Sequence, residues 1–133
     1  MNRENTYLIV DDDPVNNFLC RETILASKIK KNNIIDFTSP ELALSFLQNE
    51  VNISQNFRFI VILDIKMPQL NGWEFLDKFE TLSENIKQKV EIYILTTSID
   101  PRDKERANHR SYIKDFIIKP ISTEYIESKF AHY

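Results

Sequence analysis

The stretch of residues 59–68, FIVILDIKMP, most constrains the fold, because five apolar residues run without a break and end in a carboxylate. An uninterrupted apolar run of this length is typical of a strand buried on both faces, as in a parallel sheet. Met67-Pro68 is expected to end the strand, since proline has no N–H to donate to a neighbouring strand. Asp64 is therefore predicted to lie where a central strand meets solvent. Taken alone, it is equally consistent with a carboxylate that caps the following loop.

Length and composition favour one soluble domain. The 133 residues suit a single domain over residues 1–133, with a core from about residue 6 to residue 131. Hydrophobic residues make up 42% of the chain and charged residues 28%, which is a globular rather than a disordered composition. The net charge of −3 does not favour a nucleic-acid partner, which would select a basic chain.

The sequence contains no sign of a membrane segment. No apolar run approaches the roughly 20 residues that span a bilayer. The apolar residues 7–10 are too few for a signal-peptide core of about 7–15 residues, so we expect a cytoplasmic protein with no membrane partner. The single cysteine, Cys20, cannot form an internal disulfide and is expected to be a buried structural thiol. The single glycine, Gly72, excludes a glycine-rich phosphate-binding loop.

Strand and helix patterns alternate along the chain. Besides residues 59–63, strands are expected at residues 7–10, 34–38, 91–95 and 116–118. Helices are expected at about 15–30, from Pro40, from Gly72, at 102–110 and after Thr123, with 82–89 as a connector. The first helix is predicted to bury Phe18, Leu19, Ile24, Leu25 and Ile29, and the second Leu42, Ala43, Phe46 and Leu47. The helix at 102–110 is almost entirely polar and is expected to be loosely held.

This alternation predicts an α/β fold, with five parallel strands and helices on both faces of the sheet. In such sheets, ligands bind outside the carboxyl ends of the strands. Polar residues follow four of the predicted strands and should share that edge: Asp11, Asp12, Asp13, Asp64, Thr96, Thr97, Ser98 and Lys119.

The carboxylates at this edge would repel one another, which predicts either raised pKa values or a bound divalent cation. Oxygen ligands suit Mg²⁺, whereas zinc would favour histidine or cysteine, neither of which follows these strands. With a lysine and a hydroxyl nearby, such a site can hold a phosphoryl group, and a carboxylate can accept it as an acyl phosphate. Taken singly, Asp13 is expected to cap a helix, and Thr97 and Lys119 are equally consistent with solvated surface residues.

Four segments together resemble the response-regulator receiver domain of two-component signalling. They are LIVDDDP at 8–14, VILDIKMP at 61–68 with Asn71-Gly72, ILT at 94–96 and FIIKP at 116–120. They occur in the order of the family and span nearly the whole chain. The resemblance implies a (βα)5 flavodoxin-like, CheY-like sheet with strand order 2-1-3-4-5.

The resemblance also implies a role for each matching residue. Asp64 would be the phosphoacceptor. The ligands of Mg²⁺ or Mn²⁺ would be Asp12, Asp64, Asp11 through water, and the backbone carbonyl of Lys66. Thr96, Lys119 and Phe116 would stabilise the phosphoryl group or switch with it, and Lys66 and Ser98 would tune the reaction rates. The Lys119-Pro120 bond would be cis.

Some positions depart from the family pattern. Residues 108–111 lack the glycine that often precedes the fifth strand, so this connection is expected to differ. Phe116 lacks the hydroxyl that a tyrosine would bring to the switch position. Lys66 places a basic side chain beside the acceptor, and one hypothesis is that it mimics part of the metal charge.

The expected function is that of a stand-alone receiver. It would accept a phosphoryl group on Asp64 from a sensor histidine kinase or a histidine phosphotransfer protein. It would signal through an unknown downstream protein, using the helix at 102–110, the last strand and the last helix, or by phosphorelay. It would be no enzyme beyond its own phosphotransfer and dephosphorylation. Two alternatives stay open: a phosphorylation-independent receiver-like scaffold, and a small Mg-dependent aspartyl-phosphate phosphatase.

Overall fold

The computed structural model describes residues 4–29, 33–50, 57–66, 71–97 and 100–131. Two sequence predictions, the strand stop at Met67-Pro68 and the rate-tuning role of Ser98, fall outside the described residues. Within the described part of the chain, no helix is long and apolar enough to cross a membrane.

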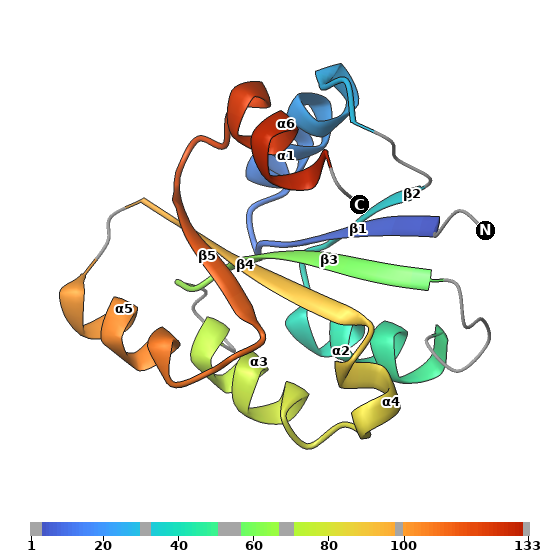
Figure 1. Cartoon of the computed structure of the whole chain (residues 1–133), viewed down its shortest axis with the longest axis vertical. Coiled ribbons are helices and arrows are strands. Elements are labelled where there is room, and N and C mark those ends of the chain that lie inside the picture. The colour runs from blue at the N-terminus through green and yellow to red at the C-terminus, as the bar shows by residue number, and fades with distance from the viewer. Residues whose placement is uncertain (1–3, 30–32, 51–56, 67–70, 98–99, 132–133) are drawn as a thin grey trace.

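Five parallel strands form one sheet in the order β2-β1-β3-β4-β5, which confirms the predicted fold class and strand order (Figure 1). The strands are β1 (Glu4–Val10), β2 (Asn33–Phe37), β3 (Phe57–Asp64), β4 (Val90–Thr96) and β5 (Ile113–Ile118). β1 begins at Glu4 instead of Tyr7. β5 begins at Ile113 instead of Phe116, because its early residues pair with β4 across a register shift beside Ile92.

Helices cover both faces of the sheet (Figure 1). α1 (Pro14–Ala26) and α6 (Thr123–Phe130) lie on one face, and the other face carries α2 (Pro40–Glu50), α3 (Gly72–Phe79), α4 (Glu84–Lys87) and α5 (Pro101–Asn108). The short α4 lies where the sequence predicts a connector. Its Ile86 is buried, which gives this turn an apolar anchor that the weak periodicity of the segment does not reveal.

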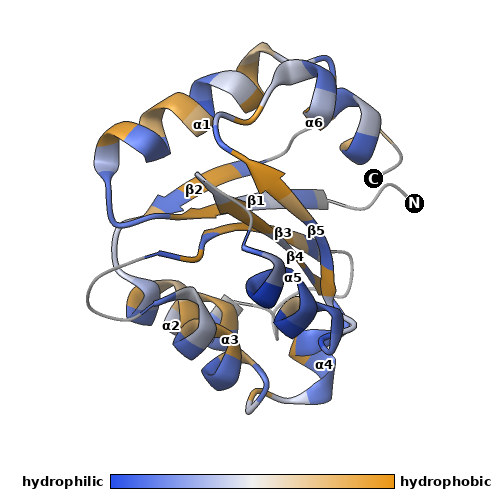
Figure 2. Ribbon diagram, turned by 90° about the vertical axis from the view of Figure 1, so that its left-hand side faces the viewer, coloured by the Kyte–Doolittle hydropathy of each residue, from blue (hydrophilic) through white to orange (hydrophobic). Residues whose placement is uncertain are grey.

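The sheet separates two hydrophobic cores, and β3 contributes to both. Phe59, Val61 and Leu63 face the core shared with α2 and α3, while Ile60 and Ile62 face the core shared with α1 and α6. In Figure 2 the hydrophobic strands lie between the two helical layers. The central strand is therefore buried on both faces, as its apolar run predicts.

The buried face of α1 differs from the predicted one. Asn17, Cys20 and Ile24 are buried, whereas three of the residues predicted to be buried are 58%, 54% and 49% exposed: Phe18, Leu19 and Leu25. Two stripes of residues at helical spacing compete on this helix, and a count of apolar residues selects the wrong one. Cys20 is a buried free thiol, as predicted, and burial raises its pKa to about 12.

Two further details of the helices correct the prediction. α1 ends at Ala26 instead of near residue 30, because Ser27 is extended and both its N–H and its hydroxyl donate to the Ile24 carbonyl. On α2, Leu42 is 61% exposed, and Ala43, Leu44 and Leu47 form the buried face. The predicted role of Asp13 as a helix cap is confirmed, because its Oδ1 accepts the Val15 N–H at 2.9 Å.

Candidate functional site

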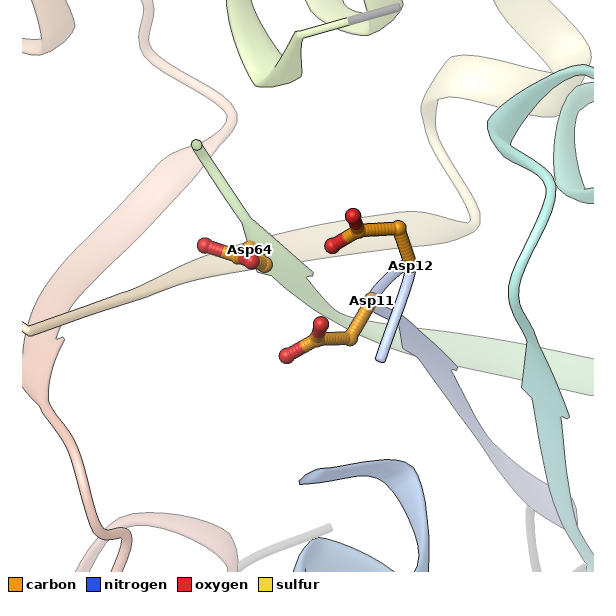
Figure 3. Close-up of side chains that lie close together, drawn as sticks. All are labelled: Asp11, Asp12 and Asp64. Atoms are coloured by element: carbon orange, nitrogen blue, oxygen red, sulfur yellow. The ribbon is translucent and has the colours of Figure 1, made fainter. Parts of the chain in front are cut away.

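Three carboxylates converge at the carboxyl edge of the sheet. Asp11 and Asp12 follow β1, and Asp64 ends β3. These strands pair in parallel with Val10 opposite Leu63, so the residues that come next lie at the same level of the edge. One carboxylate oxygen from each of the three residues lies within 4.8 Å of the others (Figure 3). Asp11 and Asp64 are buried, with 2% and 6% exposure, while Asp12 is exposed.

Lys119 brings an ammonium group to the same cluster from the end of β5. Its Nζ donates to Asp11 Oδ2 at 2.9 Å and lies 3.5 Å from Asp64 Oδ2. The backbone N–H of Lys119 donates to the Thr96 carbonyl at 2.7 Å, which ties the end of β5 to the end of β4. The Lys119-Pro120 bond is cis, as the resemblance implies.

Electrostatics at this edge leave negative charge uncompensated. Burial raises the pKa of Asp64, and the charge of Asp11 adds to that effect, while the Lys66 N–H and Lys119 oppose it. Burial lowers the pKa of Lys119, but the hydrogen bond to Asp11 and the charges of Asp11 and Asp64 outweigh burial and raise it overall. One ammonium against three carboxylates leaves two negative charges, which a divalent cation would neutralise.

The donor set fits a hard divalent cation such as Mg²⁺ or Mn²⁺, which binds oxygen ligands and keeps several waters. Both oxygens of Asp11 are already engaged, Oδ1 by the Asp13 N–H at 3.0 Å and Oδ2 by Lys119, so Asp11 suits contact through water. Asp12 makes no hydrogen bond or ion pair with any residue that the structure describes, so its oxygens are available as direct ligands. Asp64 Oδ1 accepts the Lys66 N–H at 3.1 Å.

Strand register and burial locate the other predicted site residues that the structure describes. Thr96 ends β4, one residue beyond Leu95, which pairs with Asp64, and it is 1% exposed. Phe116 is half-buried on β5 opposite Ile94. The side chains of Lys66 and Thr97 are exposed. The role of the Lys66 carbonyl stays a prediction.

Two residues near the site were not assigned to it from the sequence. Gly72 begins α3 directly against β3: its N–H donates to the Ile65 carbonyl at 2.9 Å, and a Cβ at this position would lie 2.6 Å from Ile65 Cα. Asn17 is 1% exposed, and its Nδ2 donates to the Asp11 carbonyl at 2.9 Å. The one sequence signal for Asn17 is its position shortly after three aspartates. Its burial could not be predicted, because the apolar pattern of α1 does not show which face of the helix is buried.

Comparison with known proteins agrees with this geometry. The sequence model of the response regulator receiver domain family matches residues 7–131. The probable methanogenesis regulatory protein FilR2 of Methanothrix harundinacea is 29% identical over 82 residues, which are 62% of this chain and 51% of that protein. The matched segment thus spans about half the length of this curated relative.

Solved structures resemble the chain over nearly its whole length. A two component response regulator from Cytophaga hutchinsonii has a TM-score of 0.83 and 29% identity, with 96% of this chain and 94% of that chain covered. The chemotaxis protein CheY4 of Vibrio cholerae has a TM-score of 0.74 over 97% and 98% of the two chains, and its 19% identity shows similarity of fold alone.

Proposed function

The chain belongs to the response regulator receiver domain family, and from that membership we propose that Asp64 accepts a phosphoryl group from a phosphohistidine. The donor would be a sensor histidine kinase or a histidine phosphotransfer protein. The observation that carries the proposal is the Asp64 carboxylate at the end of a buried strand, with the Lys119 ammonium 3.5 Å away and two further aspartates beside it.

In the proposed reaction, a carboxylate oxygen of Asp64 attacks phosphorus. A P–O bond forms, the P–N bond to the donor imidazole breaks, and its electron pair returns to the imidazole, which takes up a proton from solvent. The Lys119 ammonium, 3.5 Å from Asp64 Oδ2, would stabilise charge on the transferring oxygens, and the Thr96 hydroxyl would donate to one of them. Mg²⁺ or Mn²⁺ held by Asp12, Asp64, water on Asp11 and the Lys66 carbonyl would supply further positive charge there.

The proposed output is contact with another protein, or onward relay of the phosphoryl group. The contact face would comprise α5, β5 and α6, with Thr96 and Phe116 changing position after phosphorylation, and Lys66 and Ser98 would tune the lifetime of the acyl phosphate. The polarity of α5, of which Ala107 is the buried residue, supports an element that can shift without disrupting a core (Figure 2). Catalysis would be confined to the protein's own phosphotransfer and dephosphorylation. Action without an attached output domain stays a prediction.

The test is incubation with Mg²⁺ and acetyl phosphate, followed by intact mass, for the wild type and Asp64→Asn. We expect one added phosphoryl group on the wild type and none on the variant. Equal labelling of both proteins would refute Asp64 as acceptor. A folded, unlabelled wild type would instead favour a phosphorylation-independent scaffold, and continuous hydrolysis of a small phosphate ester would favour a phosphatase.

A further inference from the structure

Asn17, in the first turn of α1, ties the loop of the acidic cluster to its surroundings. Its Nδ2 donates to the carbonyl of Asp11 at 2.9 Å and, at 3.4 Å, to the carbonyl of Phe37 at the end of β2. Its backbone N–H donates to the carbonyl of Asp13 at 3.1 Å. One residue of α1 therefore holds the loop at two carbonyls, on either side of Asp12.

The contact with the Asp11 carbonyl controls more than Asp11. That carbonyl belongs to the planar peptide unit that includes the N–H and Cα of Asp12, so fixing it restricts the backbone from which the Asp12 side chain leaves. Asp11 has its own side-chain restraints, because its two oxygens accept from the Asp13 N–H and Lys119. The Asp12 carboxylate has no such partner among the described residues, so its backbone alone directs it toward Asp64.

Burial of Asn17 has a cost that packing does not explain. Its Oδ1 is buried without a hydrogen-bond partner in the described part of the chain, and leaving a buried polar atom unpaired opposes folding. The next residues on the same buried face of α1, Cys20 and Ile24, are apolar. A donor for the Asp11 carbonyl accounts for a polar residue at this position.

We propose that Asn17 is a positioning residue that aims the Asp12 carboxylate as a ligand for the divalent cation. The inference rests on the proposed function in one respect, namely that the cluster of Asp11, Asp12 and Asp64 binds such an ion. Asn17 touches neither the ion nor the phosphoryl group. It acts through the backbone between Asp11 and Asp12, as groups that orient metal ligands generally do.

The experiment measures Mn²⁺ affinity directly, by the electron paramagnetic resonance signal of free Mn²⁺, for the wild type, Asn17→Ala and Asn17→Ser. The shorter serine hydroxyl reaches the nearer Asp13 carbonyl of its own helix turn instead of Asp11. Ser27→Ala is the matched control, because Ser27 is the buried residue that follows α1, and its hydroxyl donates to the Ile24 carbonyl at the end of the helix opposite Asn17. Urea unfolding of each protein reports the stability separately.

We expect the dissociation constant for Mn²⁺ to rise about 10- to 100-fold in both Asn17 variants, the range for loss of a group that orients a metal ligand. Ser27→Ala should lose stability with no change in Mn²⁺ affinity. At saturating Mn²⁺, the rate of Asp64 labelling by acetyl phosphate should return to near the wild-type rate in the Asn17 variants. The defect would then lie in ion affinity and not in the transfer step.

Several results would overturn the proposal: wild-type Mn²⁺ affinity in the Asn17 variants, equal weakening in Ser27→Ala, failure of both Asn17 variants to fold, or no Mn²⁺ binding by the wild type. The two proposals fail separately. A wild type whose Mn²⁺ affinity depends on Asn17, but which is never labelled, refutes phosphoryl acceptance and keeps the role of Asn17. A wild type that is labelled, but whose Asn17 variants bind Mn²⁺ with wild-type affinity, keeps phosphoryl acceptance and refutes the role of Asn17.

Discussion

Gly72→Ala tests how closely α3 must approach the end of β3. The new Cβ would lie 2.6 Å from Ile65 Cα and 3.1 Å from the Asp64 carbonyl oxygen, and these are backbone atoms that cannot rotate away. Gly72 has no positive φ, so glycine is required here for space and not for conformation. Alanine would gain up to about 1 kcal/mol of helix propensity, but overpacking against a rigid neighbour costs about 1–3 kcal/mol. At so short a distance we expect a net loss of about 1–2 kcal/mol.

Urea unfolding followed by fluorescence measures this loss cleanly, because Trp73 is the single tryptophan and is buried on α3. Asn71→Ala is the matched control. It removes the Oδ1 that accepts the Glu74 N–H at 2.9 Å and should cost about 1 kcal/mol, without placing an atom near Asp64. Both variants should therefore lose similar stability, but only Gly72→Ala should also slow labelling of Asp64, since it displaces the backbone at the acceptor.

A Gly72→Ala protein as stable as the wild type, or more stable, would show that α3 moves away from β3 without cost, and the reasoning from close approach would be wrong. If Gly72→Ala and Asn71→Ala slow labelling equally, the slowing follows from lower stability of α3 and not from displacement of Asp64.

Three further predictions concern charge and packing. Because burial raises the pKa of Asp64, its proton favours the metal-free fold at low pH, and this contribution is lost as pH rises through the raised pKa. Asp64→Asn should therefore raise the free energy of unfolding in EDTA at neutral pH, with no gain below about pH 4, where Asp64 is protonated in both states. Lys119→Met leaves Oδ2 of the buried Asp11 without its ammonium partner and should cost about 2–4 kcal/mol in EDTA and less in Mg²⁺; an equal loss in both would argue against a cation in the cluster. Arg106→Ala removes a guanidinium 4.5 Å from the centroid of the Trp73 ring and should cost about 0.5–1 kcal/mol, with faster amide hydrogen exchange in α5.

The sheet and its polar edge could be predicted because each depends on a local pattern. The apolar run before Asp64 predicts a strand buried on both faces, and Ile60 and Val61 are fully buried. Once strands alternate with helices, the parallel sheet places all their carboxyl ends at one edge. Lys119 and Asp11 are 108 positions apart in sequence, yet this rule was enough to predict that they would share one edge of the sheet.

The orientation of α1 could not be predicted, because it depends on how the helix sits on the sheet. The more apolar stripe, which contains Phe18 and Leu19, faces away from the sheet. The buried stripe begins with Asn17, whose amide serves two backbone carbonyls. The pattern of side chains along a sequence does not say where backbone carbonyls will lie. The role of Asn17, which donates to two carbonyls, can therefore be recognised only from the positions of the loop and β2 in the structure.

The attachment of α5 shows how charge can replace apolar burial at a helix. The sequence predicts a loosely held element, since Ala107 alone among its described residues is buried. The structure supplies a polar attachment: the guanidinium of Arg106 stacks on Trp73, and Arg110, just after the helix, contacts Asp77 at 2.8 Å and Glu80 at 2.7 Å on and after α3. Charged contacts at a surface weaken with ionic strength, whereas the cores on either side of the sheet do not depend on it in this way. The polar contacts that attach α5 can therefore weaken while the sheet that carries Asp64 stays intact.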